Sequence, residues 1–387
     1  MQVRCLKIVD ARFNQDEVHP ATEGTWDYAE FVDGRHDDWF NDWISFDCIL
    51  ADDERQTVWC GLTRLNTDIF WAYDRQRGTF RSLGYQKVAD RYDAKFHRSL
   101  TFDKDGKVWA ATALLHEIDR YHEAPGGAIV RFDPQTERIE IVDRPLPHLY
   151  IQSLVLDADR GLLYGQAFTP ETLFVYDIKT GRCENLGPLG SGLAMAQAEQ
   201  LVIDRNGAVW GCWGVTRAWS NAGTGPTTFR LWRYHPDEKK RQFLDAGLPS
   251  IKGGECYVKS DGEHAGPDGA VYMGTAEGTL CRIDPDTFEV DLVGKPAPGR
   301  RLTGMANGPD GLLYGSCGRD GGANLFRYDP ANGEMTHLGP IYDPTAGEQA
   351  WQVHDMTIAA DGTIYAGEND VPHRSGYLWE ISGAIDV

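Results

Sequence analysis

The sequence has no excess of basic residues, no long apolar run and no closely spaced pair of cysteines. Lys and Arg number 38 against 58 Asp and Glu, which gives a formal net charge of −20. Nucleic-acid-binding proteins usually need a basic face, and anionic membrane surfaces attract basic segments, so this charge argues against both partners. An acidic ligand would need a local cluster of Arg or His to offset the negative field of the whole protein.

Three further absences narrow the class of protein. No stretch of about 18 apolar residues is present, which argues against a membrane-spanning helix. The N-terminus lacks the apolar core of a secretory signal, so we expect a cytoplasmic protein, or a secreted one whose leader is absent from this sequence. The eight cysteines form no Cys-x-x-Cys pair, which in a chain of 387 residues indicates buried free thiols rather than a disulfide framework.

A short phrase recurs seven times along the chain. Each copy has a turn, usually with Asp and Gly, followed by apolar residues and an aromatic residue, as in the segment Asp105–Trp109. The first copy, Asp52–Trp59, lacks the turn glycine. The seven aromatic residues are Trp59, Trp109, Tyr164, Trp210, Tyr272, Tyr314 and Tyr365. Their spacings of 50, 55, 46, 62, 42 and 51 residues suit propeller blades of about 40 to 50 residues with loop insertions.

Each copy is followed by a second aromatic segment, such as Ile129–Asp133 or Leu325–Asp329. Short alternating runs joined by Asp-Gly turns predict antiparallel hairpins, and helical periodicity is nearly absent. We therefore predict an all-β fold, a seven-bladed β-propeller of four-stranded antiparallel blades. We expect a single domain over residues 1–387, in which an N-terminal strand within residues 3–8 closes the last blade.

The inner strand of each blade ends at the central channel, so polar residues there should converge. In the second blade we expect an inner strand from Phe96 to Phe102, which places His97 beside His116 at the mouth of the channel. His116 and Arg217 each lie seven residues after the aromatic residue of their own repeat, which predicts similar positions two blades apart. Tyr150 begins the inner strand of the third blade. These four residues, His97, His116, Tyr150 and Arg217, are the catalytic candidates.

Such a funnel suits an acidic sugar, because indoles stack on sugar faces and a guanidinium pairs with a carboxylate. The candidate substrate-binding residues are Arg64, Trp213, Trp219 and Arg301. Cleavage at a uronic acid by β-elimination removes the C5 proton once the neighbouring carboxylate is neutralised, and a second group protonates the departing O4. Imidazoles suit this proton transfer near neutral pH. Separately, His264, His354, His373 and Cys256 are ligand types for Zn²⁺, although they lack compact spacing.

At the paired histidines, in Phe96–Arg98 and Leu115–Glu117, the chain resembles the β-propeller polysaccharide lyases. This group includes ulvan lyases, rhamnosyl-glucuronate lyases and oligogalacturonate lyases. The resemblance implies a carbon–oxygen lyase that acts on glucuronate-type glycans, with Tyr150 as the family's tyrosine. The strand that carries the family's arginine has none here. Either Arg217 or Gln166 neutralises the substrate carboxylate instead, or the substrate differs from the family's. The chemistry requires no cofactor, and the resemblance implies a bound Zn²⁺ or Ca²⁺.

Two alternatives remain open from the sequence. A metal-dependent lactonase or hydrolase of the same fold would need carboxylate and Asn ligands on the axis, where the sequence offers His, Gln and Arg. A non-catalytic glycan-binding propeller would use the same aromatic and arginine side chains, and only the histidines favour the enzyme. In each case the expected partner is an acidic oligosaccharide or polysaccharide, not a nucleic acid or a membrane.

Overall fold

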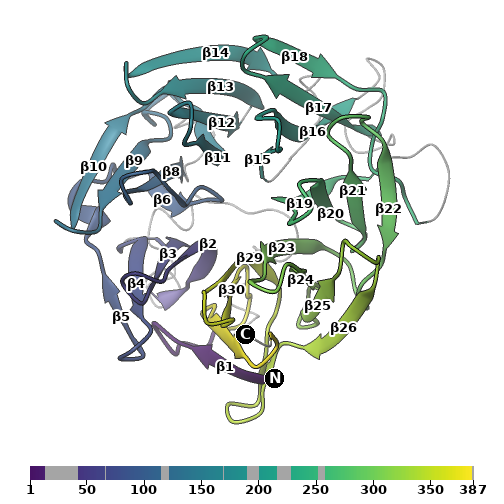
Figure 1. Cartoon of the computed structure of the whole chain (residues 1–387). Coiled ribbons are helices and arrows are strands. Elements are labelled where there is room, and N and C mark those ends of the chain that lie inside the picture. Colours follow the sequence, from purple (N-terminus) through teal and green to yellow (C-terminus); the bar gives the residue numbers. More distant parts are fainter. Residues whose placement is uncertain are drawn as a thin grey trace. The chain divides into compact units, whose positions relative to one another are not determined.

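The protein is built almost entirely of short antiparallel strands (Figure 1). The computed structural model describes residues 1–13, 42–65, 67–114, 122–168, 170–189, 200–215, 228–251 and 258–385. The chain divides into two compact units, of which the first combines Met1–Ile151 with Ile341–Val387 and the second spans Gln152–Pro340. Within the described ranges, no helix is long and apolar enough to cross a membrane.

The first unit contains three sheets. One consists of β2 (Ser45–Asp52), β3 (Thr57–Thr63), β4 (Phe70–Asp74) and β5 (Thr79–Ser82). The next holds β7 (Thr101–Phe102), β8 (Val108–Leu114), β9 (Ile129–Asp133) and β10 (Arg138–Asp143). Strand β6 (Asp93–Phe96) pairs with both β3 and β8, so it joins these two sheets. The last sheet has the order β1 (Gln2–Leu6), β31 (Leu378–Ser382), β30 (Ile364–Glu368) and β29 (Val353–Ile358).

The second unit contains four sheets of four strands, each in sequence order. The first has β11 (Tyr150–Asp157), whose first two residues belong to the other unit, with β12 (Leu162–Phe168), β13 (Thr172–Asp177) and β14 (Arg182–Pro188). The second has β15 (Val202–Ile203), β16 (Val209–Val215), β17 (Thr228–His235) and β18 (Lys240–Phe243). The third has β19 (Ser260–Ala265), β20 (Val271–Thr275), β21 (Leu280–Ile283) and β22 (Val290–Gly294). The fourth has β23 (Leu302–Asn307), β24 (Leu313–Cys317), β25 (Asn324–Tyr328) and β26 (Met335–Pro340).

These sheets confirm the predicted fold class, an all-β propeller of four-stranded antiparallel blades. The described residues form seven groups of four antiparallel strands, two of which β6 joins into one nine-stranded sheet. Each repeated aromatic residue lies on a strand that has a paired strand on each side. Apolar faces pack between neighbouring sheets, as in the first unit, where the rings of Trp59 and Phe132 meet edge to face at 5.1 Å. That the whole chain forms a single domain stays a prediction.

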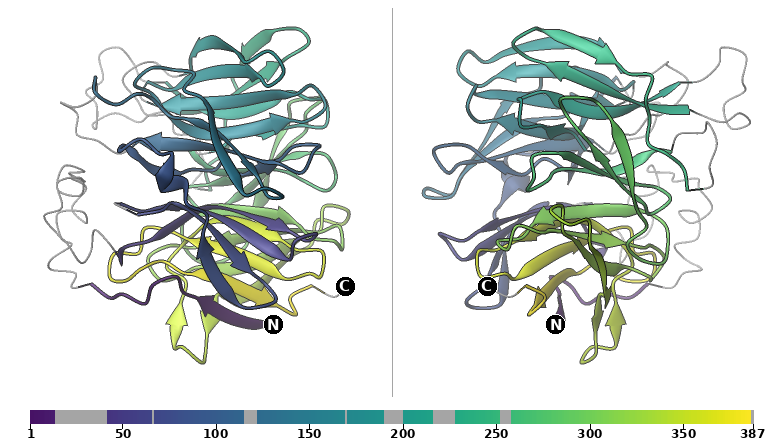
Figure 2. Two further views of the ribbon diagram at one scale, coloured as in Figure 1. Left: turned by 90° about the vertical axis from the view of Figure 1, so that its left-hand side faces the viewer. Right: turned by 45° about the vertical axis from the view of Figure 1, so that its right-hand side comes forward.

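The N-terminal strand completes the last sheet of the first unit. β1 pairs with β31 in the register Val3↔Ile381 and Cys5↔Trp379. A small hairpin of β27 (Tyr342–Asp343) and β28 (Glu348–Gln349) lies beside β1 in both views of Figure 2. Its Asp343 carboxylate accepts a hydrogen bond of 3.0 Å from the amide of Cys5. The hairpin therefore covers part of an edge strand that would otherwise expose an unpaired amide.

A hydrogen bond across the turn explains why the repeated phrase combines an acid with an aromatic residue. In five copies the indole N–H or phenol O–H donates to a nearby aspartate: Trp59 to Asp52 (3.2 Å), Trp109 to Asp103 (2.8 Å), Trp210 to Asp204 (2.7 Å), Tyr272 to Asp268 (3.2 Å) and Tyr314 to Asp310 (2.7 Å). Tyr365 donates to Glu380 instead, at 3.3 Å. The buried hydroxyl of Tyr164 has no hydrogen-bond partner among the described residues.

The turn glycines adopt the left-handed backbone that an L-residue rarely takes. Gly106 and Gly207, for example, have φ of 72° and 80°. In the first copy, which lacks the glycine, Gln56 occupies this conformation with φ of 51°. A non-glycine residue there is strained by the contact of its Cβ with the backbone.

One predicted strand is interrupted. The expected inner strand Phe96–Phe102 is divided between the end of β6 and β7, with His97–Leu100 between them. Arg98 has φ of 37°, which is incompatible with extended strand geometry. The break therefore frees His97 from the alternation of side chains along a strand.

Candidate functional site

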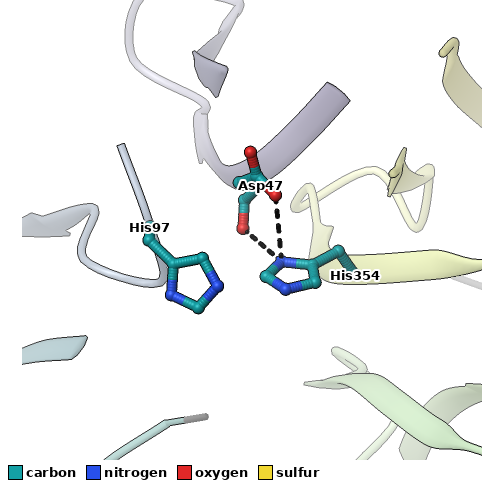
Figure 3. Close-up of side chains that lie close together, drawn as sticks. All are labelled: Asp47, His97 and His354. Atoms are coloured by element: carbon teal, nitrogen blue, oxygen red, sulfur yellow. Dashed lines mark hydrogen bonds and ion pairs between the residues drawn. The ribbon is translucent and has the colours of Figure 1, made fainter. Parts of the chain in front are cut away.

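Asp47, His97 and His354 form a buried cluster in the first unit (Figure 3). One carboxylate or imidazole atom from each residue lies within 4.8 Å of the others. The two imidazole rings have centroids 4.8 Å apart and planes inclined by 64°. None of the three residues is more than 3% exposed. Among the described residues, this is the one group of three or more His, Cys, Asp or Glu side chains that meets such a distance limit.

Local irregularities in the strands determine where these three side chains point. The β2–β3 register shifts between Phe46 and Cys48, so Asp47 is the extra residue of a bulge. The β29–β30 register shifts in the same way between Val353 and Asp355, at His354. His97 directly follows the last residue of β6. Bulges redirect a side chain away from the regular alternation of a strand, which here brings three residues of different sheets together.

Both ring nitrogens of His354 have partners. Nδ1 lies 2.7 Å from the backbone carbonyl oxygen of Asp47 and 3.8 Å from its carboxylate. The Nε–H of Arg98 donates to Nε2 at 3.4 Å. A carbonyl oxygen can only accept and a guanidinium can only donate, so these contacts assign the proton of the neutral ring to Nδ1.

The Asp47 carboxylate is held by a hydroxyl and an ammonium. Thr63 donates a short hydrogen bond to Oδ2, and Nζ of Lys95 lies 3.3 Å from Oδ1. Burial raises the pKa of Asp47 from its ordinary 3.8 to about 6, with a further increase from the charge of Asp370 and an opposing decrease from Lys95. The raised pKa brings the protonation equilibrium of Asp47 closer to neutral pH than that of an ordinary aspartate.

Two cations contact this cluster, Lys95 at Asp47 and Arg98 at His354, and a third cation, Arg64, follows Thr63 in the chain. Arg98 is buried, and the Lys95 ammonium stays partly exposed. Arg64 follows β3; its amide donates to the carbonyl of Ala94 at 3.0 Å, and its guanidinium lies over the ring of Trp71 at 5.6 Å. Burial lowers the pKa of Arg64. An imidazole beside a carboxylate and two cations is an arrangement that can take part in proton transfer.

The structure places the predicted catalytic and substrate residues of the first unit as follows. His97 belongs to the cluster, and so does His354, which the sequence suggested as a metal ligand. Tyr150, the first residue of β11, is half-buried against Tyr92 and Ala124. His373 packs its ring against Trp351 at 5.3 Å and is not part of the cluster.

The candidates of the second unit lie on strands or next to them. Gln166 on β12 is fully buried, and neither atom of its amide has a partner among the described residues. Trp213 on β16 donates its indole N–H to the carbonyl of Leu231 at 3.2 Å and packs against Phe243. Arg301 precedes β23, with its Nε 4.0 Å from the carboxylate of Asp261.

His264 on β19 is also in the second unit, and burial lowers its pKa to about 4. Four further candidates lie outside the described residues: His116, Arg217, Trp219 and Cys256. The roles predicted for all these residues remain predictions.

The sequence analysis missed Asp47, although the repeat contains the signal for it. Asp47 and His97 each lie 12 residues before the aromatic residue of their own copy, and His354 lies 11 residues before Tyr365. Residues at one offset in successive repeats occupy equivalent places in their sheets. Aligning the copies on this offset would have grouped Asp47 with His97 and left His354 one position away.

The cluster offers two imidazoles and one carboxylate, a donor set that suits Zn²⁺. The contact between Arg98 and His354 opposes this use, because a lone pair that accepts a hydrogen bond does not ligate a metal at the same time. The residue types of the cluster therefore suit a metal ion, whereas the hydrogen bond between Arg98 and His354 opposes its binding.

No family model matches the chain, and no curated protein matches it in sequence. Several solved structures are similar to it. A catalytically inactive virginiamycin B lyase from Staphylococcus aureus, solved with quinupristin, has a TM-score of 0.61 and 14% identity over 88% of this chain and 95% of its own. The WD40 repeats of RRP9 give a TM-score of 0.56 and 9% identity over 87% of this chain and 94% of theirs.

A third similar structure is the extracellular domain of a protein from Bacteroides thetaiotaomicron described as a hybrid two-component system. Its TM-score is 0.58 at 13% identity, and the match covers 87% of this chain but 38% of that one. The chain thus spans well under half the length of that structure. At these identities the likeness shows the fold alone, which is a β-propeller.

Proposed function

We propose that the protein is a carbon–oxygen lyase that cleaves a glycosidic bond at a uronic acid by β-elimination. The main observation behind the proposal is the buried cluster of His97, His354 and Asp47. The cations Lys95 and Arg98 lie beside this cluster. The reaction needs a base of near-neutral pKa and a positive charge for the substrate carboxylate. The cluster and its surroundings contain both kinds of group.

In the proposed reaction His97 takes the C5 proton of the uronate. The electron pair of the C5–H bond forms the C4–C5 double bond, and the C4–O4 bond breaks. The leaving O4 receives a proton from a second group, for which Tyr150 and His116 are the candidates from the sequence. Lys95 is the described cation best suited to neutralise the carboxylate, since its side chain stays partly exposed beside Asp47. Arg64, a candidate from the sequence, is buried. Arg217 stays a candidate for the same task.

The fold is compatible with such chemistry, because a similar structure belongs to a protein named as a lyase. That protein is named for an antibiotic substrate, so the uronate specificity proposed here does not come from the comparison. It comes from the cations around the imidazoles and from the resemblance of the His97 segment to uronate lyases.

The test is a panel of uronate-containing glycans, with the ultraviolet absorbance of the unsaturated product followed over time. We expect absorbance to rise on at least one glucuronate-type substrate. His97→Gln should remove the signal, whereas His337→Gln, at an exposed histidine of β26, should leave it unchanged. Binding of a glycan without any absorbance change would instead indicate a glycan-binding module.

A second candidate is a metal-dependent hydrolase or lactonase. The observation in its favour is the spacing of Asp47, His97 and His354, whose ligand atoms lie within 4.8 Å of one another. Such an enzyme would release product without the absorbance of a double bond, and a chelator would abolish its activity. A lyase of the proposed kind keeps its activity after chelation.

A further inference from the structure

Arg98 has an unusual backbone conformation for a buried residue. It directly follows His97, is 4% exposed and has φ of 37°, in the left-handed region. Strain of this kind persists only where the surrounding structure holds it, and it often marks a functional position. The side chain that this conformation places inside the protein is the guanidinium that contacts His354.

The contacts of His354 admit one uncharged form of the ring. Nδ1 faces the carbonyl oxygen of Asp47 at 2.7 Å, which requires a proton on Nδ1. Nε2 faces the Nε–H of Arg98 at 3.4 Å, which requires a lone pair on Nε2. A proton on Nε2 would set two donors against each other beside a buried positive charge.

The same contact bears on metal binding. A divalent metal would have to bind His354 through Nε2, because Nδ1 carries the proton. The guanidinium occupies this direction, and its positive charge would repel the ion. Arg98 also acts on the neighbouring acid: burial raises the pKa of Asp355, and the charge of Arg98 opposes that rise. The charges of Arg98 and Asp355 thus partly balance each other inside the protein.

We propose that Arg98 is a positioning residue that holds His354 as a neutral, Nδ1-protonated ring and keeps divalent metals out of the Asp47–His97–His354 cluster. The cluster then acts without a metal, and His97 is the imidazole left to carry the proton. The inference concerns the state of the site and does not depend on the substrate.

Calorimetric titration of the full chain with Zn²⁺ tests the metal part. We expect the His354→Gln variant to bind Zn²⁺ as the unmodified protein does, because the cluster of the unmodified protein binds no Zn²⁺. Arg98→Met should gain one zinc site, which binds Zn²⁺ at least about tenfold more tightly than any zinc site of the unmodified protein. The double variant Arg98→Met with His354→Gln should lose this site again, and Arg98→Lys, which keeps the charge, should not gain it.

Nitrogen NMR of the histidine rings tests the tautomer directly. The signals assigned to His354 through the His354→Gln variant should show a neutral ring with the proton on Nδ1, and Arg98→Lys should restore the pattern that Arg98→Met changes. A zinc site in the unmodified protein that disappears in His354→Gln, or a proton on Nε2, would overturn the proposal. Neither readout needs activity, so a failed lyase assay and a failed inference are separate results.

Discussion

The turns of the sheets and the Asp47–His97–His354 cluster are both built from repeat positions, but the turns make the same contact in most copies whereas the cluster combines residues from several copies. At the turns, five copies make the same hydrogen bond from an aromatic residue to an aspartate. At the cluster, an aspartate and two histidines from similar offsets of three copies meet at one point, whereas the other copies add no residue to it among those described. Repetition at the turns stabilises each sheet separately, whereas variation at the other position builds a site from several sheets.

The difference separates residues that maintain the fold from residues available for chemistry. A turn hydrogen bond needs only its own copy, so the loss of one should affect stability alone. The cluster needs side chains from β2, from the segment after β6 and from β29. The following predictions test this separation.

The largest expected effect is on activity. His97→Gln should lower the rate of the elimination by about 10² to 10⁴-fold, the usual contribution of a general base. Trp109→Phe, 12 residues along the same copy, removes the hydrogen bond to Asp103 and should leave the rate nearly unchanged while lowering the melting temperature. Product absorbance and thermal unfolding of both variants provide the comparison. Equal losses of rate in the two variants would show that the separation fails.

Asp47 should make stability depend on pH. Its pKa is about 6 in the folded protein against an ordinary 3.8, so the folded state favours the protonated acid. Its stabilising contribution is complete below the lower value and is lost as pH rises through about 6. Relative to Asp47→Asn, the wild type should lose about 3 kcal/mol of unfolding free energy over this range. Urea unfolding at several pH values measures the difference, and a constant difference would contradict the raised pKa.

Two tyrosines at equivalent turns form a matched pair. Tyr314 donates to Asp310 at 2.7 Å, whereas the hydroxyl of Tyr164 is buried and has no partner among the described residues. Tyr314→Phe should cost about 1.5 to 3 kcal/mol, because the hydrogen bond is to a charged group. Tyr164→Phe should be neutral or slightly stabilising, since it removes an unsatisfied buried hydroxyl. Chemical denaturation of both variants decides, and equal costs would count against the role of the hydrogen bond.

The smallest effect concerns the turn that lacks glycine. Gln56→Gly should raise the unfolding free energy by about 0.5 kcal/mol, because it relieves the left-handed strain at a modest entropic cost. The reverse change, Gly106→Gln, should lower it by about 1 kcal/mol. Denaturant midpoints of the two variants should therefore move in opposite directions.

Much of the fold could be predicted from the sequence because its determinants are local. The Asp-Gly turns and alternating segments specify hairpins within a few residues, and their sevenfold recurrence predicts the blades. The site was less predictable. His97 was found from its chemistry, but Asp47 looked like an ordinary strand residue, since bulges and the break at Arg98 follow from packing between sheets and leave no local signal.

The predicted pairing of His97 with His116 stays a prediction, because His116 lies outside the described residues. The structure adds a neighbour of His97 that the sequence analysis did not pair with it, His354. These two residues are 257 positions apart, and their similar offsets of 12 and 11 residues before the repeated aromatic residue are what relates them in the sequence. Residues with reactive side chains at similar offsets in different copies are therefore the set to compare first in proteins of this architecture.

The pairing of β1 with β31 has a consequence for the order of folding. Val3 and its partner Ile381 are 378 positions apart in the sequence, so this pairing closes a very long loop and gains nothing from local contacts. Until the pairing forms, the amides of β1 and the buried side chain of Val3 lack their final neighbours. We therefore expect the sheet that contains β1 to be completed late in folding, after the hairpins within the other sheets.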